Sequence, residues 1–271
     1  MQGGVAESLG LALLYGVTTF LPVSREGHLA LAEMLFVPAG VSPTQRFQWA
    51  CGALLATLIV TSGQLKRMAK ALVSRLLRRS AGGPSPDERD LVSIGLAQLT
   101  TFTFWAALGE ARRDLYRYPL VIAVGLTLTA VALLSMAWIG PRRRLSLSPT
   151  QALLLGAVQG LALVPGISRI GCTMVAAMWM GLTDRRSFDL SVLISIPLMI
   201  VGVAEAGLPA QIHETASSLA LLSSGITAAG GIVAVVALRS LVAHEKTAWF
   251  SMWVAPLAIA TFAFSRVWPG Q

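Results

Sequence analysis

The sequence has 271 residues, of which 55% are hydrophobic and only 13% are charged, and it carries a formal net charge of +8. Because soluble domains contain about 25% charged residues, this composition excludes an ordinary soluble domain and indicates an integral membrane protein. The basic residues flank apolar stretches and form no single basic face, so we expect contacts with anionic membrane lipids and none with nucleic acid.

The first apolar region, residues 5–36, is interrupted at its centre by the segment LPVSREGH at positions 21–28. A single straight helix tolerates this combination of proline, glycine and charge poorly. Two half-helices that meet at a polar turn are therefore predicted. Inside a membrane such a turn is stable only where protein or water faces it, so we predict a re-entrant helical hairpin.

Six further stretches contain no charged residue and are long enough to cross the hydrocarbon core of a bilayer as helices. They are residues 47–65, 91–109, 119–140, 190–204, 217–238 and 247–265. A second interrupted region, residues 151–182, precedes the fourth stretch and contains VPGISRIG at positions 164–171. The predicted fold is an all-α polytopic membrane protein, one membrane domain over residues 1–271, with two re-entrant hairpins and about six full transmembrane helices.

Basic residues cluster in four segments between the apolar stretches, at positions 64–90, 141–150, 185–186 and 239–246. The positive-inside rule assigns all four segments to the cytoplasm. Segments 110–118 and 208–215 then lie on the outer side, although the arginines of the former make it a weak indicator. The first interrupted region consequently enters from outside and the second from the cytoplasm, so we expect their tips to meet near the membrane midplane.

The two interrupted regions resemble each other residue by residue. Four identical pairs recur at an offset of 144 positions: Gly16/Gly160, Ser24/Ser168, Arg25/Arg169 and Gly27/Gly171. Together with the opposite directions of entry, these pairs predict an inverted repeat with halves of roughly 1–140 and 141–271. Inverted repeats with discontinuous helices commonly bind substrate at the midplane, where half-helix N-termini point at an anion.

The residues at the tips suit a phosphate ligand. Arg169 lies in an otherwise uncharged stretch, where a cation without an anionic partner is unfavourable. Pro165 and Gly166 are expected to end one half-helix, and Ser168 is well placed to cap the next. Backbone N–H groups, a helix dipole and a guanidinium then converge on one point. Arg25 repeats the arrangement in the first half, so the two arginines suit a ligand with two phosphates.

Several of these residues also allow a purely structural interpretation. In one such interpretation, Arg169 pairs with Glu26 and ties the two halves together. In another, Arg25 extends its guanidinium to the water layer. His28 is either a general acid or base, or a hydrogen-bonded packing residue. Glu26 is the one carboxylate within either tip, and it is a candidate to hold a divalent cation or to accept a proton.

The motifs FLPVSxxGH at the first tip and PGxSRxGxT at the second are similar to those of the undecaprenyl-diphosphate phosphatase family, the bacitracin-resistance proteins. The resemblance covers nearly the whole chain. It implies a multi-pass enzyme of the bacterial inner membrane that removes the terminal phosphate of undecaprenyl diphosphate on the periplasmic side, usually with a divalent cation such as Mg²⁺ or Ca²⁺. The reaction recycles the lipid carrier for peptidoglycan and other envelope glycans.

The chemistry of the tip residues and the resemblance together give the candidate site. His28, Ser24 and Glu26 are the candidate catalytic residues, and Glu26 is the candidate metal ligand. The candidate substrate-binding residues are Arg169, Arg25, Ser168, Gly166, Gly171 and Thr173.

The agreement with the family pattern is partial. Tyr15 and Thr19 occupy the positions of two glutamates of the family's first motif. Arg25 stands where the family usually has a second serine, proposed as a nucleophile, and Ile170 replaces a serine of the second motif. The anion-binding part of the pattern is thus retained more completely than its acidic part.

These residues leave two functions open, and the inverted-repeat architecture by itself leaves a third, a small-anion channel or ion exchanger. The first is hydrolysis of undecaprenyl diphosphate at a rebuilt site. The second is a polyprenyl-phosphate transporter or binding protein that does not hydrolyse its ligand, because the missing glutamates and the added arginine make the site more positive. No residue indicates the oligomeric state, so a homodimer is left open beside a monomer.

Overall fold

The computed structural model describes residues 5–37, 40–77, 83–206 and 218–268. These ranges contain helices and no strand, which confirms the predicted all-α fold class. The elements are α1 (Val5–Phe20), α2 (Arg25–Phe36), α3 (Pro43–Leu76), α4 (Pro86–Leu108), α5 (Ala111–Asp114), η1 (Leu115–Arg117), α6 (Pro119–Ser135), η2 (Met136–Trp138), α7 (Pro149–Leu161), α8 (Arg169–Trp179), α9 (Asp184–Glu205), α11 (Ser218–Ala243), η3 (Thr247–Phe250) and α12 (Ser251–Ser265).

Five helical segments are long and apolar enough to cross a membrane, as expected of a multi-pass membrane protein. They are Pro86–Leu108, Pro119–Trp138, Asp184–Glu205, Leu219–Ala243 and Thr247–Ser265. The predicted span 47–65 lies inside α3 and is not among them, since Gln48 and Gln64 add polarity at both ends of its apolar part. The predicted outer segment 208–215 lies outside the described residues.

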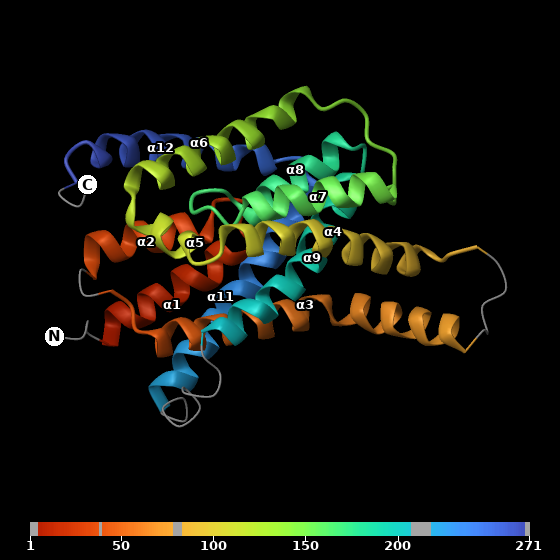
Figure 1. Cartoon of the computed structure of the whole chain (residues 1–271), viewed down its shortest axis with the longest axis horizontal. Coiled ribbons are helices and arrows are strands. Elements are labelled where there is room, and N and C mark those ends of the chain that lie inside the picture. The colour runs from red at the N-terminus through yellow and green to blue at the C-terminus, as the bar shows by residue number, and fades with distance from the viewer. Residues whose placement is uncertain (1–4, 38–39, 78–82, 207–217, 269–271) are drawn as a thin grey trace.

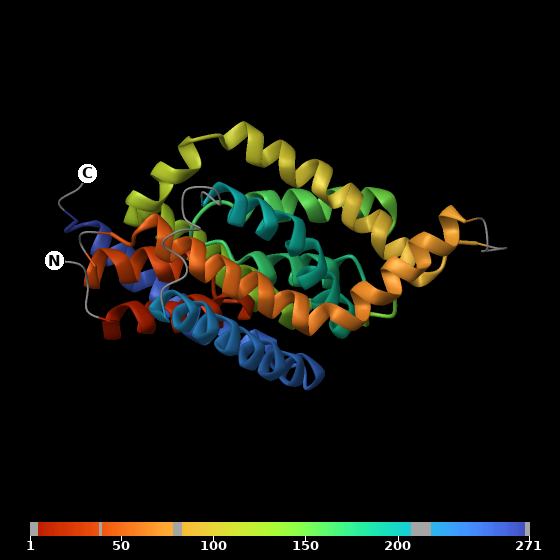
Figure 2. The same cartoon turned by 90° about the horizontal axis from the view of Figure 1, so that it is seen from below.

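Helix α3 extends beyond the bundle. Its 34 residues correspond to about 51 Å at 1.5 Å per residue, which exceeds the roughly 30 Å of bilayer hydrocarbon. A capping box starts the helix, because the Ser42 hydroxyl accepts the Gln45 N–H and the Gln45 side chain accepts the Ser42 N–H. The C-terminal part of α3 contains Lys66, Arg67 and Lys70, and it projects past the other helices together with the start of α4 (Figures 1 and 2).

Both interrupted regions are broken into two helices. The first break separates α1 from α2 at residues 21–24, and the second separates α7 from α8 at residues 162–168. Figure 1 shows the α1–α2 pair opening towards the end of the molecule that carries both chain termini, and the α7–α8 pair opening towards the opposite end. Entry and exit of each pair on one side of a membrane stays a prediction.

The tips of the two pairs touch at glycines, in one contact glycine against glycine and in the other glycine against proline. A Cβ atom on Gly27 would lie 3.0 Å from the Cα atom of Gly166, and one on Gly171 would lie 3.0 Å from the Cβ atom of Pro22. The offset of 144 positions that relates Gly27 to Gly171 also relates Pro22 to Gly166, so the two contacts are equivalent. The N-termini of α2 and α8 are thereby held next to each other.

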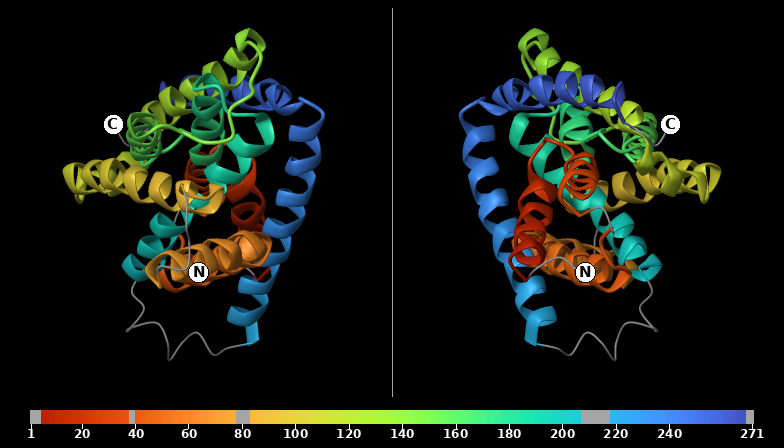
Figure 3. Two further views of the ribbon diagram at one scale, coloured as in Figure 1. Left: turned by 90° about the vertical axis from the view of Figure 1, so that its right-hand side faces the viewer. Right: turned by 90° about the vertical axis from the view of Figure 1, so that its left-hand side faces the viewer.

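The helices around the tips follow the same scheme. Helix α1 packs along α11 and α7 packs along α4, while α6 and α12 pack against each other. Figure 3 shows α11 along one edge of the bundle with α1 beside it. This arrangement is what an inverted repeat requires, and the division into halves 1–140 and 141–271 stays a prediction.

We expect Gly166→Ala to lower the free energy of unfolding by at least about 2 kcal/mol, because the residue has a positive φ of 93° and its Cβ would lie 2.7 Å from the backbone nitrogen of Leu126. The thermal unfolding midpoint in detergent measures this loss. Gly10→Ala is the matched control, since a Cβ there meets nothing within 4 Å. Equal midpoints for the two variants would show that the tip is loosely packed.

Candidate functional site

A cavity of about 600 Å³ lies where the two hairpin tips meet the ends of α3, α4, α5 and α9. Its wall includes Arg25 and Arg169, the first residues of α2 and α8, together with Glu26 and Ser168. Backbone N–H groups and helix dipoles at two helix N-termini favour negative charge in this space. The structure thus brings together the two arginines that the repeat relates.

The first tip is held by Ser24, which is buried and has a positive φ of 71°. This backbone conformation is uncommon for a residue other than glycine, so the surrounding structure must enforce it. The Ser24 hydroxyl accepts the Gly27 N–H at 3.2 Å and caps α2. The chain therefore turns sharply enough for Arg25 to enter the cavity.

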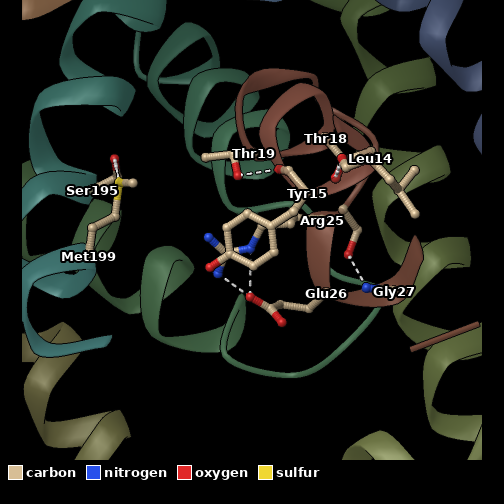
Figure 4. Close-up of polar contacts among 10 residues, drawn as sticks. Leu14, Tyr15, Thr18, Thr19, Arg25, Glu26, Gly27, Ser195 and Met199 are labelled. Atoms are coloured by element: carbon tan, nitrogen blue, oxygen red, sulfur yellow. Dashed lines mark hydrogen bonds and ion pairs between the residues drawn. The ribbon is translucent and has the colours of Figure 1, made fainter. Parts of the chain in front are cut away.

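Arg25 is surrounded by two protein groups, as Figure 4 shows. Its guanidinium lies 4.5 Å from the centre of the Tyr15 ring, a cation–π contact, and it forms an ion pair with Glu26. The side chain is 17% exposed, so it does not reach a water layer outside the protein. The alternative in which Arg25 extends away from the site is therefore wrong.

The second tip is tied to α6. The Ser168 N–H donates to the Thr129 hydroxyl at 2.8 Å, and that hydroxyl donates to the Gly166 carbonyl at 2.8 Å. The Ser168 hydroxyl accepts the Gly171 N–H at 3.1 Å, which confirms the predicted cap of α8. Thr129, 39 residues before Ser168, thus fixes the turn that carries Arg169.

Arg169 has no carboxylate within ion-pair distance in the described part of the chain, and its buried Nε has no hydrogen-bond partner there. Glu26 pairs with Arg25, so the tie between Glu26 and Arg169 that the sequence left open does not form. A buried cation without a partner is unfavourable unless a ligand supplies the anion. Arg169 therefore presents an uncompensated positive charge to the cavity.

Three arginines that the sequence analysis did not single out line the same cavity: Arg46, Arg112 and Arg113. Arg112 pairs with Glu205 of α9 and lies 4.9 Å from the centre of the Trp105 ring. The wall thus contains five arginines and two glutamates, a formal excess of three positive charges.

For Arg112 and Arg113 the sequence signal was present but ambiguous. Segment 110–118 contains three arginines in a predicted outer loop, where the positive-inside rule does not expect them. Because Arg112 meets Glu205 across 93 positions of chain, no local pattern could assign the loop to the site.

His28 lies outside the cavity wall. Its Nε2 accepts a hydrogen bond from the Trp253 indole N–H at 3.0 Å, so Nδ1 carries the proton and donates to the Ser24 carbonyl at 2.8 Å. Both ring nitrogens are thus used by the protein, as in the packing interpretation. The Ser24 hydroxyl is likewise engaged in capping, so Glu26 is the one candidate catalytic residue on the wall.

Three candidate substrate-binding residues, Gly166, Gly171 and Thr173, also lie outside the wall. The Thr173 hydroxyl donates to the Arg169 carbonyl at 2.6 Å, and the two glycines allow the tips to approach. These contacts hold Arg169 in place, so other groups of the wall bind the ligand.

Three of the four residues that we expect to depart from the family pattern contact each other. Tyr15, at a glutamate position, carries the guanidinium of Arg25, which stands at a serine position. The Thr19 hydroxyl, at the second glutamate position, donates to the Tyr15 carbonyl at 2.6 Å (Figure 4). Tyr15, Thr19 and Arg25 thus form one connected group at the cavity wall.

The wall does not fit a resident divalent cation. The described residues contain no group of three histidine, cysteine, aspartate or glutamate side chains that could hold a metal. Both glutamates on the wall, Glu26 and Glu205, are paired with arginines. A hard cation prefers several free oxygen ligands, and this wall offers mainly guanidinium groups.

Known proteins match this chain over nearly its whole length. A family model described as "Bacitracin resistance protein BacA" matches residues 8–260. The undecaprenyl-diphosphatase of Nitrosococcus oceani is 32% identical over 231 residues, which cover 81% of this chain and 84% of the relative. That of Korarchaeum cryptofilum is 28% identical over 261 residues, covering 94% of this chain and 97% of the relative.

Inorganic pyrophosphate should bind the purified protein, and Arg169→Ala should weaken this binding by about 10- to 100-fold, since a hydrogen bond to a charged group contributes about 1.5–3 kcal/mol. Titration calorimetry in detergent measures the affinity. Arg143→Ala, an exposed charge of the opposite basic segment, is the control and should bind as the wild type does. Unchanged affinity of Arg169→Ala would remove the cavity as the anion site.

Proposed function

This chain belongs to the bacitracin resistance protein BacA family, and on that premise we propose that it hydrolyses undecaprenyl diphosphate to undecaprenyl phosphate and inorganic phosphate. The unpaired guanidinium of Arg169 in the cavity is the observation that carries the proposal, because it leaves one charge free for a phosphate. The reaction returns the lipid carrier to the synthesis of peptidoglycan and other envelope glycans.

The two arginines of the tips hold the diphosphate. Arg169 contacts one phosphate directly, and Arg25 contacts the other after exchanging its ion pair with Glu26 for the ligand. The N–H groups that begin α2 and α8 add a favourable field at the same place. Apolar residues of the wall, Leu163, Leu198 and Met199, suit the first isoprene unit of the lipid.

Exchange of partners at Arg25 frees the carboxylate of Glu26. Glu26 then accepts a proton from a water molecule, whose oxygen attacks the terminal phosphorus. The bond between that phosphorus and the bridging oxygen breaks, and undecaprenyl phosphate leaves with the bridging oxygen. Guanidinium groups around the cavity stabilise the charge that develops on the phosphoryl oxygens.

Ser24 and His28 position the site and take no part in the proton transfer. The Ser24 cap and the hydrogen bonds of His28 to Trp253 and to the Ser24 carbonyl hold the strained turn before Arg25. Arginines supply the positive charge around the diphosphate, since the described wall lacks the ligands for a divalent cation.

The site opens on the outer side of the membrane in this proposal. Segment 110–118, the end of α9 and the start of α3 contribute to the wall, and the positive-inside rule assigns these parts to the side opposite the basic segments. In a bacterium this is the periplasmic or exterior side of the inner membrane. Hydrolysis is preferred over non-hydrolytic transport because relatives across the family are named undecaprenyl-diphosphatases.

Phosphate release from undecaprenyl diphosphate by the purified wild type tests the function. Arg169→Ala should lower kcat/KM by about 10²- to 10³-fold through loss of charge stabilisation. Glu26→Gln should lower kcat by a similar or larger factor through loss of the base. Arg143→Ala should retain wild-type turnover. Tight binding of the lipid by the wild type without any release would favour the transporter or binding protein instead.

Addition of EDTA should leave most of this phosphate release intact, because arginine side chains supply the positive charge around the diphosphate. The initial rate is measured after chelation and again after Mg²⁺ or Ca²⁺ is restored. The triple variant Tyr15→Glu, Thr19→Glu, Arg25→Ser restores the acidic family pattern and should bind Mn²⁺ more tightly than the wild type, as seen by electron paramagnetic resonance. Complete loss of wild-type release in EDTA, reversed by metal, would refute the arginine-based site.

A further inference from the structure

A second cavity, of about 520 Å³, lies between α3, α9 and α11. Three arginines line it, Arg67 from α3, Arg185 from α9 and Arg239 from α11, together with the single carboxylate of Asp189. It belongs to the basic segments that the positive-inside rule assigns to the cytoplasm. It is therefore separate from the cavity at the hairpin tips, with which it shares no residue.

The three arginines mark one level of the membrane. Arg67 follows the uncharged stretch 47–65, Arg239 follows the stretch 217–238, and Arg185 precedes the stretch 190–204. Cations at the ends of apolar spans lie in the headgroup layer, where lipid phosphates are found. Three helices thus deliver one guanidinium each to the depth of the phosphate groups.

The charges in this cavity are incompletely paired. Arg239 lies 3.7 Å from Asp189 and 6.0 Å from the centre of the Phe188 ring, both loose contacts. Arg67 lies 3.7 Å from Asp87 at the start of α4. Arg185 is exposed and forms no ion pair within the described ranges. An anion with several oxygen acceptors can therefore bridge groups that the protein leaves apart.

Lipid chains have a surface beside the arginines. Ile59 and Val236 are 49% and 61% exposed, and they lie one helical turn before the cavity residues Gly63 and Arg239. Together with Val60 on the cavity wall, they give the site a basic rim and an apolar flank. Acyl chains can pack against such an apolar flank, whereas a free phosphate ion cannot.

We propose that this cavity binds the phosphate headgroup of an anionic phospholipid, with the acyl chains along the exposed face of α3 and α11. The guanidinium groups of Arg185 and Arg239 donate to the phosphate oxygens from two sides, and Arg67 adds a third positive charge. The site stabilises the bundle at its basic, cytoplasmic end, and it does not depend on the proposed hydrolysis.

The test measures the thermal unfolding midpoint of the full chain in detergent while phosphatidylglycerol is titrated. We expect the lipid to raise the midpoint of the wild type and of Arg143→Ala, a charge loss elsewhere in the basic segments. The double variant Arg185→Ala, Arg239→Ala should need at least about 10-fold more lipid for the same rise. Arg185→Ala alone keeps the Arg239–Asp189 pair, and it should need about 3-fold more.

Each remaining outcome decides against the site. An unchanged lipid response of both variants would place the binding elsewhere. An equal rise with phosphatidylcholine would mean that the headgroup charge is not recognised. The full rise with inorganic phosphate alone would identify a free anion as the ligand and overturn the lipid assignment.

Discussion

The contact between the two hairpin tips is the constraint on which the candidate site depends. Gly27 lies against Gly166 and Gly171 against Pro22, so a side chain at Gly27 or Gly171 would crowd the opposite turn. Hydroxyl groups at Ser24, Ser168 and Thr129 satisfy backbone groups that this irregular chain would otherwise leave without partners. Two helix N-termini consequently border one cavity, and that is the arrangement which favours an anion.

Electrostatics explains why the cavity is suited to a ligand and is not a fully compensated structural core. Arg25, Arg46, Arg112 and Arg113 each have a glutamate partner, at Glu26, Glu33, Glu205 and Glu110. Arg169 has none in the described ranges. A partly buried cation without an anionic partner costs desolvation energy. The unpaired guanidinium of Arg169 is therefore consistent with an anion that arrives as part of the substrate.

Tyr15 and Thr19, which we expect at glutamate positions of the family, suit the positive charge of Arg25. An arginine beside two glutamates would be compensated by them, and these positions hold Tyr15 and Thr19 instead. The Tyr15 ring supports Arg25 by a cation–π contact, and Trp49 packs against Tyr15 at 5.9 Å between ring centres. The Tyr15 ring thus contacts both the Arg25 guanidinium and the Trp49 ring.

The sequence by itself determined the membrane class, most of the spans, the broken regions and the arginine at each tip. These features follow from local composition, since uncharged stretches, Pro-Gly breaks and capping serines act within a few residues. Only the tertiary structure decided the partners. Glu26 pairs with Arg25 and not with Arg169, His28 turns to Trp253 across 225 positions, and Arg112 joins the cavity through Glu205. Such choices depend on distances between helices far apart in the chain, which local pattern does not encode.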